Sequence, residues 1–184
     1  MKNEQNAYIL SILVENTPGV LSQVARLFSR KGYNIDSIAS GTTEDPLVTR
    51  ITIVIAGDEG MITHITAQLR KLLPVISVKV LSTANSVQRE LVLVKVRAET
   101  REKKDEIIQT ANVFRASVVD MSRETLTIAI IGDEGKAAAL LDLLRDLGIL
   151  EVVRTGTIAI ERGRNTIYDN NKEKGEFNYG KNVL

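Results

Sequence analysis

The feature that most constrains the fold of this chain is an internal repeat. The segment Ile51–Gly60 (Ile-Thr-Ile-Val-Ile-Ala-Gly-Asp-Glu-Gly) returns as Leu126–Gly135 (Leu-Thr-Ile-Ala-Ile-Ile-Gly-Asp-Glu-Gly). Each copy has a run of strand-forming residues, then Gly-Asp-Glu-Gly, then residues with helical periodicity. Turn residues alone could match by chance, but the same order of elements surrounds both copies. The repeat therefore indicates two tandem copies of one module.

The first copy has the element order βαββαβ. Its first helix presents Val20, Leu21, Val24, Leu27 and Phe28 at helical spacing, and Gly32 ends it. The second helix starts near Glu59 and ends before Pro74. The predicted strands are Tyr8–Val14, Ile35–Ser40, Val48–Ala56 and Val75–Leu81.

The second copy repeats this order after a short polar linker. Its predicted strands are 91–98, 116–122, 125–131 and 152–160, and its predicted helices are 103–114 and 136–147. We therefore expect a first domain over 7–82, a linker over 83–88, a second domain over 89–162 and a tail over 163–184.

A βαββαβ unit forms an antiparallel sheet with both helices on one face, so the expected class is α+β with two tandem ferredoxin-like modules. Strands such as Ile9–Val14 are apolar on both sides rather than alternating. The helix-free face then needs another cover, which we expect to be a homodimer partner or the other module.

Composition excludes several classes of protein. Lys and Arg number 24 against 23 Asp and Glu, with no basic cluster of the kind that binds nucleic acid. There is no cysteine, so disulfides and thiolate sites are excluded. No apolar run approaches the ~20 residues of a membrane span, and Met1–Ala7 is too polar for a secretory signal. A cytoplasmic protein without membrane contact is expected.

Catalytic patterns are missing as well. His64 is the single histidine, lies beside the apolar stripe of its helix and has no nucleophile motif near it. The pairs Asp58-Glu59 and Asp133-Glu134 stand at helix starts, where the helix dipole is a sufficient reason for them. With no metal-ligand cluster and no phosphate-binding loop, we expect a chain without catalytic, metal or cofactor sites of its own.

The most informative segment is Glu15-Asn-Thr-Pro-Gly-Val-Leu21, which joins the first strand to the first helix. Asn16 or Thr17 suits a helix cap, Pro18 suits the first turn, and Gly19 leaves room for a ligand to approach the backbone. Backbone N–H groups at a helix start bind anions such as an amino-acid carboxylate. The alternative is a capped turn that binds nothing.

The corresponding junction of the second copy differs. Residues 98–105 read Ala-Glu-Thr-Arg-Glu-Lys-Lys-Asp, without Gly, Pro or Asn. A carboxylate ligand finds no close backbone approach in such a charged junction. If both copies diverged from one module, only the first retains a ligand loop.

Four segments together resemble one known family. They are Glu15–Leu21, Gly32–Ile35 (Gly-Tyr-Asn-Ile), Val87–Val96 (Val-Gln-Arg-Glu-Leu-Val-Leu-Val-Lys-Val) and Phe114–Asp120 (Phe-Arg-Ala-Ser-Val-Val-Asp). This combination resembles the small regulatory subunit of acetohydroxyacid synthase (acetolactate synthase), whose N-terminal module is an ACT domain. The resemblance spans nearly all of residues 7–162.

The resemblance implies a non-catalytic subunit that forms a homodimer and joins a separate, large catalytic subunit. That partner uses thiamine diphosphate, Mg²⁺ and usually FAD to join two 2-oxo acids, the first shared step toward valine, leucine and isoleucine. The small subunit activates it and confers feedback inhibition by a branched-chain amino acid, most often valine. The effector residues implied by the motif are Asn16, Thr17, Pro18, Gly19, Val20, Leu21, Asn34 and Ile35. Of these, Asn34 would reach the effector from the other protomer.

Two alternatives remain at this point. An ACT-type sensor of another amino-acid-pathway enzyme shares the Asn16–Gly19 loop but does not need the Gln88-Arg89-Glu90 segment. A transcriptional regulator needs a DNA-reading helix, which the pattern does not contain. The identity of the effector stays open among the branched-chain amino acids, and the tail after Arg162 is longer than expected for the family.

Overall fold

The computed structural model describes residues 6–169 and divides into two units by contacts within the chain. The first unit combines the chain up to Val87 with the residues from Ala159 onward, and the second unit is Gln88–Ile158. The expected tail over 163–184 is therefore described only as far as residue 169, and residues 170–184 lie outside the described part. Among the described residues, no helix combines the length and apolar composition needed to cross a membrane.

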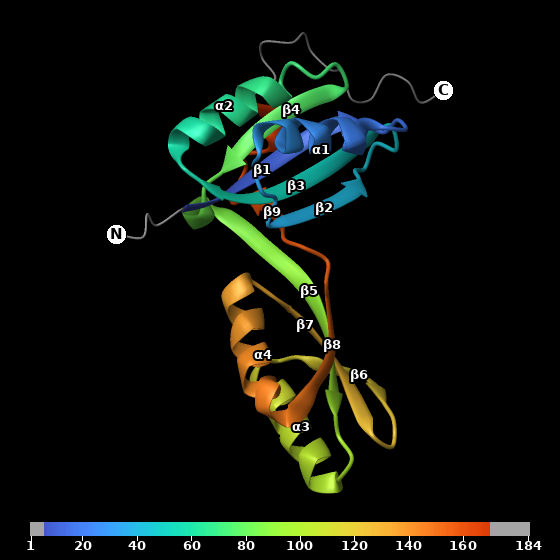
Figure 1. Ribbon diagram of the computed structural model, residues 1–184. Helices are drawn as coiled ribbons and strands as arrows, with labels where there is room; N and C mark the ends of the chain where they lie inside the picture. The colour runs from blue at the N-terminus through green and yellow to red at the C-terminus, as the bar shows by residue number, and fades with distance from the viewer. Residues whose placement is uncertain (1–5, 170–184) are drawn as a thin grey trace. The chain divides into compact units, whose positions relative to one another are not determined.

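The first unit has the predicted βαββαβ order (Figure 1). Its elements are β1 (Asn6–Glu15), α1 (Val20–Lys31), β2 (Ser37–Thr42), β3 (Val48–Gly57), α2 (Glu59–Leu69) and β4 (Val75–Leu81), followed by the short 3-10 helix η1 (Thr83–Asn85). The strands form an antiparallel sheet in the order β2-β3-β1-β4. The ferredoxin-like prediction is confirmed for this module.

The main core of the first unit lies between this sheet and its two helices. Alternate residues of β1 face the helices because successive side chains of a strand point to opposite faces. The largest fully buried members are Phe28 of α1, Leu10 and Ile12 of β1, Ile51, Ile53 and Ile55 of β3, and Ile65 and Leu69 of α2. Gly32, at φ 67°, ends α1 and donates its N–H to the carbonyl oxygens of Phe28 and Ser29.

The second unit repeats the arrangement. Its elements are β5 (Ser86–Arg97), α3 (Arg101–Val113), β6 (Ser117–Met121), β7 (Thr125–Gly132), α4 (Glu134–Gly148) and β8 (Ile149–Arg154). The next strand, β9 (Ile158–Glu161), lies in the first unit from Ala159 onward. The strand order is β6-β7-β5-β8, and β9 also pairs with β5. Val92, Val94 and Val96 of β5 pack toward the helices together with Ile107 and Leu140.

The last predicted strand, 152–160, is wrong in its bounds. It is two strands, because the chain turns between β8 and β9 at Gly156, whose φ of 79° belongs to the left-handed region that favours glycine. This break sends the chain from the second unit back to the first. The predicted second domain over 89–162 therefore differs from the structural unit, which ends at Ile158.

The helix-free face of the first sheet is covered by the chain's own residues 159–169, which we call the C-terminal strap. Ala159 packs against Ile9 and Leu81, and Ile167 packs against Leu13 and Val48. In Figure 1 this red segment lies behind the sheet and α1 lies in front. The expected cover of this face is thus supplied, for these residues, by the chain itself within the first unit, and the homodimer stays a prediction.

Polar side chains on the same face bind the backbone of the strap. Arg50 donates to Ser11 Oγ and to the Ala159 carbonyl oxygen, both at 2.9 Å. Lys79 forms an ion pair with Glu161 and donates to the Thr166 carbonyl oxygen at 2.9 Å. Burial lowers the pKa of the Arg50 guanidinium, while the nearby Tyr168 and Glu44 oppose that change. The strap is therefore held by both apolar and charge-assisted contacts.

Candidate functional site

The loop between β1 and α1 leaves the start of the helix without a side-chain cap. Gly19 occupies the N-cap position at φ 87°, and its carbonyl oxygen accepts the Gln23 N–H at 3.0 Å. Neither Asn16 nor Thr17 caps the helix, so that prediction is wrong. Pro18 precedes the helix instead of lying in its first turn, because Gly19 in the left-handed region turns the chain between them.

The other α-helices of the described chain are capped in the usual way. Asp58 accepts the Met61 N–H at 2.7 Å, Thr100 accepts the Lys103 N–H at 3.3 Å, and Asp133 accepts the Lys136 N–H at 2.8 Å. The predicted positions of the two Asp-Glu pairs at helix starts are confirmed, and their Asp side chains in addition cap the helices. Among the α-helices of residues 6–169, α1 alone has neither a side-chain cap nor an acidic residue in its first turn. The Val20 N–H donates to the Thr17 carbonyl oxygen at 3.5 Å, and the N–H groups that follow it in the first turn can donate to an external anion.

Space is available at this helix start. A Cβ atom added to Gly19 would meet no other atom within 4 Å, so the backbone faces open space. Val20 is buried at 4% exposure and anchors the loop in the core, whereas Leu21 is 47% exposed. Thr17 and Pro18 are also exposed. The loop thus combines an accessible backbone with an apolar side chain beside it.

The Asn16 side chain is bound to the hairpin between β2 and β3. Its Nδ2 donates to the Pro46 carbonyl oxygen at 2.8 Å, and its Oδ1 accepts from Thr49 Oγ1 at 3.0 Å. Its backbone N–H donates to the Leu47 carbonyl oxygen at 2.7 Å. A primary amide has two donor hydrogens and an acceptor oxygen with two lone pairs, so Asn16 retains one of each for a ligand. Sequence reasoning missed the hairpin partners, which lie 30 and 33 residues away along the chain.

Asn34 and Ile35 lie beyond the far end of α1. Asn34 Nδ2 donates to Asp36 Oδ1 at 3.1 Å, and Ile35 packs against the first core. The 12 residues of α1 span ~18 Å at 1.5 Å per residue, which keeps Asn34 away from Asn16 within one chain. A site that uses both residues needs Asn34 from a second protomer, as the resemblance implies, and that assignment stays a prediction.

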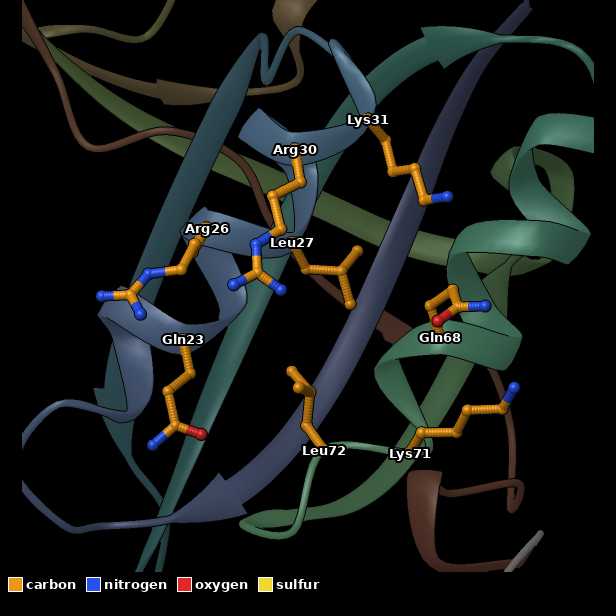
Figure 2. Close-up of a pocket in the computed structure, with 8 residues that line it drawn as sticks. All are labelled: Gln23, Arg26, Leu27, Arg30, Lys31, Gln68, Lys71 and Leu72. Atoms are coloured by element: carbon orange, nitrogen blue, oxygen red, sulfur yellow. The ribbon is translucent and has the colours of Figure 1, made fainter.

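A groove of about 310 Å³ lies between α1 and α2 (Figure 2). Leu27 and Leu72 approach each other across its middle, and cationic side chains surround them. Arg30 and Lys31 belong to the last turn of α1, and Lys71 follows α2. Cations at helix C-termini complement the helix dipole, so the charge of the groove has a structural reason. None of the predicted effector residues lines it. His64 is exposed on α2, in keeping with its expected position.

The comparisons with known proteins agree with this architecture. Residues 10–77 match the family model described as AHAS small subunit-like ACT domain, and residues 89–163 match the model described as small subunit of acetolactate synthase. A Mycobacterium leprae protein named acetolactate synthase small subunit is 46% identical over 156 residues, which cover 85% of this chain and 92% of that protein.

The match to two further relatives covers almost the whole length of each relative. The "Probable acetolactate synthase small subunit" of Methanothermobacter thermautotrophicus is 46% identical over 164 residues, covering 89% of this chain and 98% of that protein. The crystal structure of the acetolactate synthase small subunit from Thermotoga maritima matches with a TM-score of 0.81 and 39% identity, covering 87% of this chain and 99% of that one. With both modules matched, this chain belongs to the acetolactate synthase small-subunit family, whose members are non-catalytic regulatory subunits.

Proposed function

We propose that this chain binds the large catalytic subunit of acetolactate synthase, activates it, and makes it sensitive to feedback inhibition by a branched-chain amino acid, with valine as the first candidate. The observation that carries the effector site is the uncapped start of α1 beside an accessible Gly19 and the Asn16 amide. The cofactors of the reaction (thiamine diphosphate, Mg²⁺ and FAD) belong to the catalytic partner in this proposal.

The effector is held as a zwitterion. Its carboxylate accepts from N–H groups of the first turn of α1 that have no side-chain cap, where the helix dipole also favours negative charge. The spare donor and acceptor of Asn16 bind its polar groups, and its aliphatic side chain lies near the exposed Leu21. Asn34 of a second protomer completes the site, so the effector binds a homodimer.

Inhibition follows if the effector prefers one arrangement of the complex over another. A coupling free energy of ~1–3 kcal/mol gives a change in affinity of ~5–150-fold, which is sufficient for feedback control. By reciprocity, the catalytic subunit then changes the affinity of this chain for the effector by the same factor.

The test is reconstitution with the large subunit. The purified chain is titrated calorimetrically with valine, leucine and isoleucine, and synthase activity is measured with and without it. We expect higher activity on addition of the chain and inhibition by the amino acid that binds. Unchanged synthase activity at saturating chain would contradict the partner assignment, and no heat with any of the three amino acids would contradict the effector site.

A further inference from the structure

The C-terminal strap reaches the hairpin that holds Asn16. Tyr168 of the strap donates its hydroxyl hydrogen to Glu44 Oε1 at 3.0 Å, across 124 residues of sequence. Glu44 lies in the turn between β2 and β3, the same turn whose Pro46 carbonyl oxygen accepts from Asn16. A continuous series of contacts therefore connects the strap to the proposed effector loop within the first unit.

The turn itself is internally braced. The Leu47 N–H donates to Asp45 Oδ1 at 2.9 Å, and the Asp45 N–H donates to Thr43 Oγ1 at 3.2 Å. Val48, at the start of β3, is buried against Ile167 of the strap. These contacts connect Glu44 and Val48 to the rest of the turn. We therefore expect a displacement of Glu44 or Val48 to shift the Pro46 carbonyl oxygen that binds Asn16.

The strap is in turn anchored on the sheet away from the hairpin. Ser77 Oγ, on β4, donates to the Ile167 carbonyl oxygen at 3.1 Å, and Lys79 binds Glu161 and Thr166. These anchors fix the position of Tyr168 relative to the sheet. The Tyr168–Glu44 bond is thus a specific link between the anchored strap and the hairpin, distinct from the contacts that keep the strap attached.

We propose that Tyr168 and Glu44 are positioning residues for the effector loop: the strap holds the β2–β3 hairpin, and the hairpin holds the Asn16 amide in its ligand-binding orientation. This inference rests on the proposed function. Preorganised groups bind more tightly because less ordering is needed on binding.

The test compares three variants of the full chain. Tyr168→Phe removes the hydroxyl and should weaken valine binding, or binding of whichever branched-chain amino acid the wild type prefers, by about fivefold, the lower end of typical site-to-site coupling. Glu44→Gln keeps an acceptor oxygen for Tyr168 and should retain wild-type affinity. Ser77→Ala removes one strap anchor and leaves the Lys79 contacts, which still hold Tyr168 near Glu44, so it should lower the thermal midpoint yet keep the affinity within about twofold.

Hydrogen exchange tests the link without an effector. The backbone N–H groups of Asn16 and Val48 donate to the carbonyl oxygens of Leu47 and Asp45. Both should exchange faster in Tyr168→Phe than in Ser77→Ala or the wild type. Unchanged exchange in Tyr168→Phe, or equal losses of affinity in Tyr168→Phe and Ser77→Ala, would overturn the positioning role. If the wild type binds no branched-chain amino acid, the proposed function fails, and the exchange result alone decides this inference.

Discussion

The two modules share a fold but differ at the junction between their first strand and first helix. In the first module, Gly19 in the left-handed region leaves the helix start uncapped and accessible. In the second, Thr100 caps α3 and Glu102 stands in its first turn. A negative side chain already satisfies the helix dipole there. The same βαββαβ frame thus leaves the start of its first helix open to a ligand in one module and caps it with its own side chains in the other.

The helix-free faces of the two sheets differ in how deeply their apolar side chains are buried. Leu13 of β1 is fully buried beneath the strap, whereas Leu93 of β5 is 37% exposed. On the same face of the second sheet, the side chains of Ile131 and Val153 are 64% and 53% exposed. The strap therefore gives the first module a second apolar layer.

The largest effect expected from this contrast is on stability. Leu13→Ala should lower the free energy of unfolding by ~2–5 kcal/mol, since it removes buried methyl groups and leaves a cavity. Leu93→Ala, on the helix-free face of the second module's central strand, should cost clearly less because its side chain is partly solvated. Denaturant unfolding of both variants measures this, and equal losses would show that the strap leaves Leu13 no better buried than Leu93.

The next effect concerns the ligand loop. Gly19→Asp should abolish effector binding, because its side chain occupies the approach to the helix start and its charge repels a carboxylate. Gly148→Asp is the control in the second module, since its φ of 93° is close to the 87° of Gly19. Both variants should lose ~1–3 kcal/mol through backbone strain. Calorimetry should show that the Gly148→Asp variant still binds the effector and that the Gly19→Asp variant does not. Retained feedback inhibition in the Gly19→Asp variant would contradict the loop assignment.

A smaller loss is expected for Asn16→Ala. It removes two exposed hydrogen bonds to the hairpin, which contribute ~1 kcal/mol each at most, together with the amide proposed to bind the effector. Effector affinity should fall about tenfold, which corresponds to ~1.4 kcal/mol. Thr49→Val removes only the contact to Asn16 Oδ1 and should give an intermediate affinity. If Asn16→Ala binds branched-chain amino acids as well as the wild type does, Asn16 is not an effector ligand.

The smallest effect concerns the capped helix of the second module. The pKa of Glu102 is lowered by a hydrogen bond from its own backbone N–H and by the Thr100 hydroxyl. Its stabilising contribution is therefore present above the unfolded-state pKa and is lost as the pH falls through the lowered folded-state pKa. A carboxyl titration followed by NMR should show the lowered pKa in the wild type and a rise toward the ordinary value in Thr100→Val. No change in Thr100→Val would remove the hydroxyl as a cause.

Sequence reasoning predicted the repeated fold because hydrophobic periodicity is a local property. The stripe of Val20, Val24 and Phe28 is visible in the sequence and forms the buried face of α1. Cap residues at Asp58 and Asp133 were equally predictable, since each bonds an N–H three residues later. Asn16 was expected to cap α1 in the same way, but its side chain instead bonds to Pro46 and Thr49 of a hairpin that is distant in sequence.

The two modules, the family resemblance and the Glu15–Leu21 loop that differs between the modules can all be read from the amino-acid sequence. The uncapped start of α1, the bonds from Asn16 to the hairpin and the cover of the first sheet by residues 159–169 are visible only in the folded chain. The physical reason is the range of the interactions. Periodicity and caps act over three or four residues, whereas the strap's contacts to Lys79 and Glu44 span 82 and 124 residues of sequence, and no local pattern encodes such a pairing.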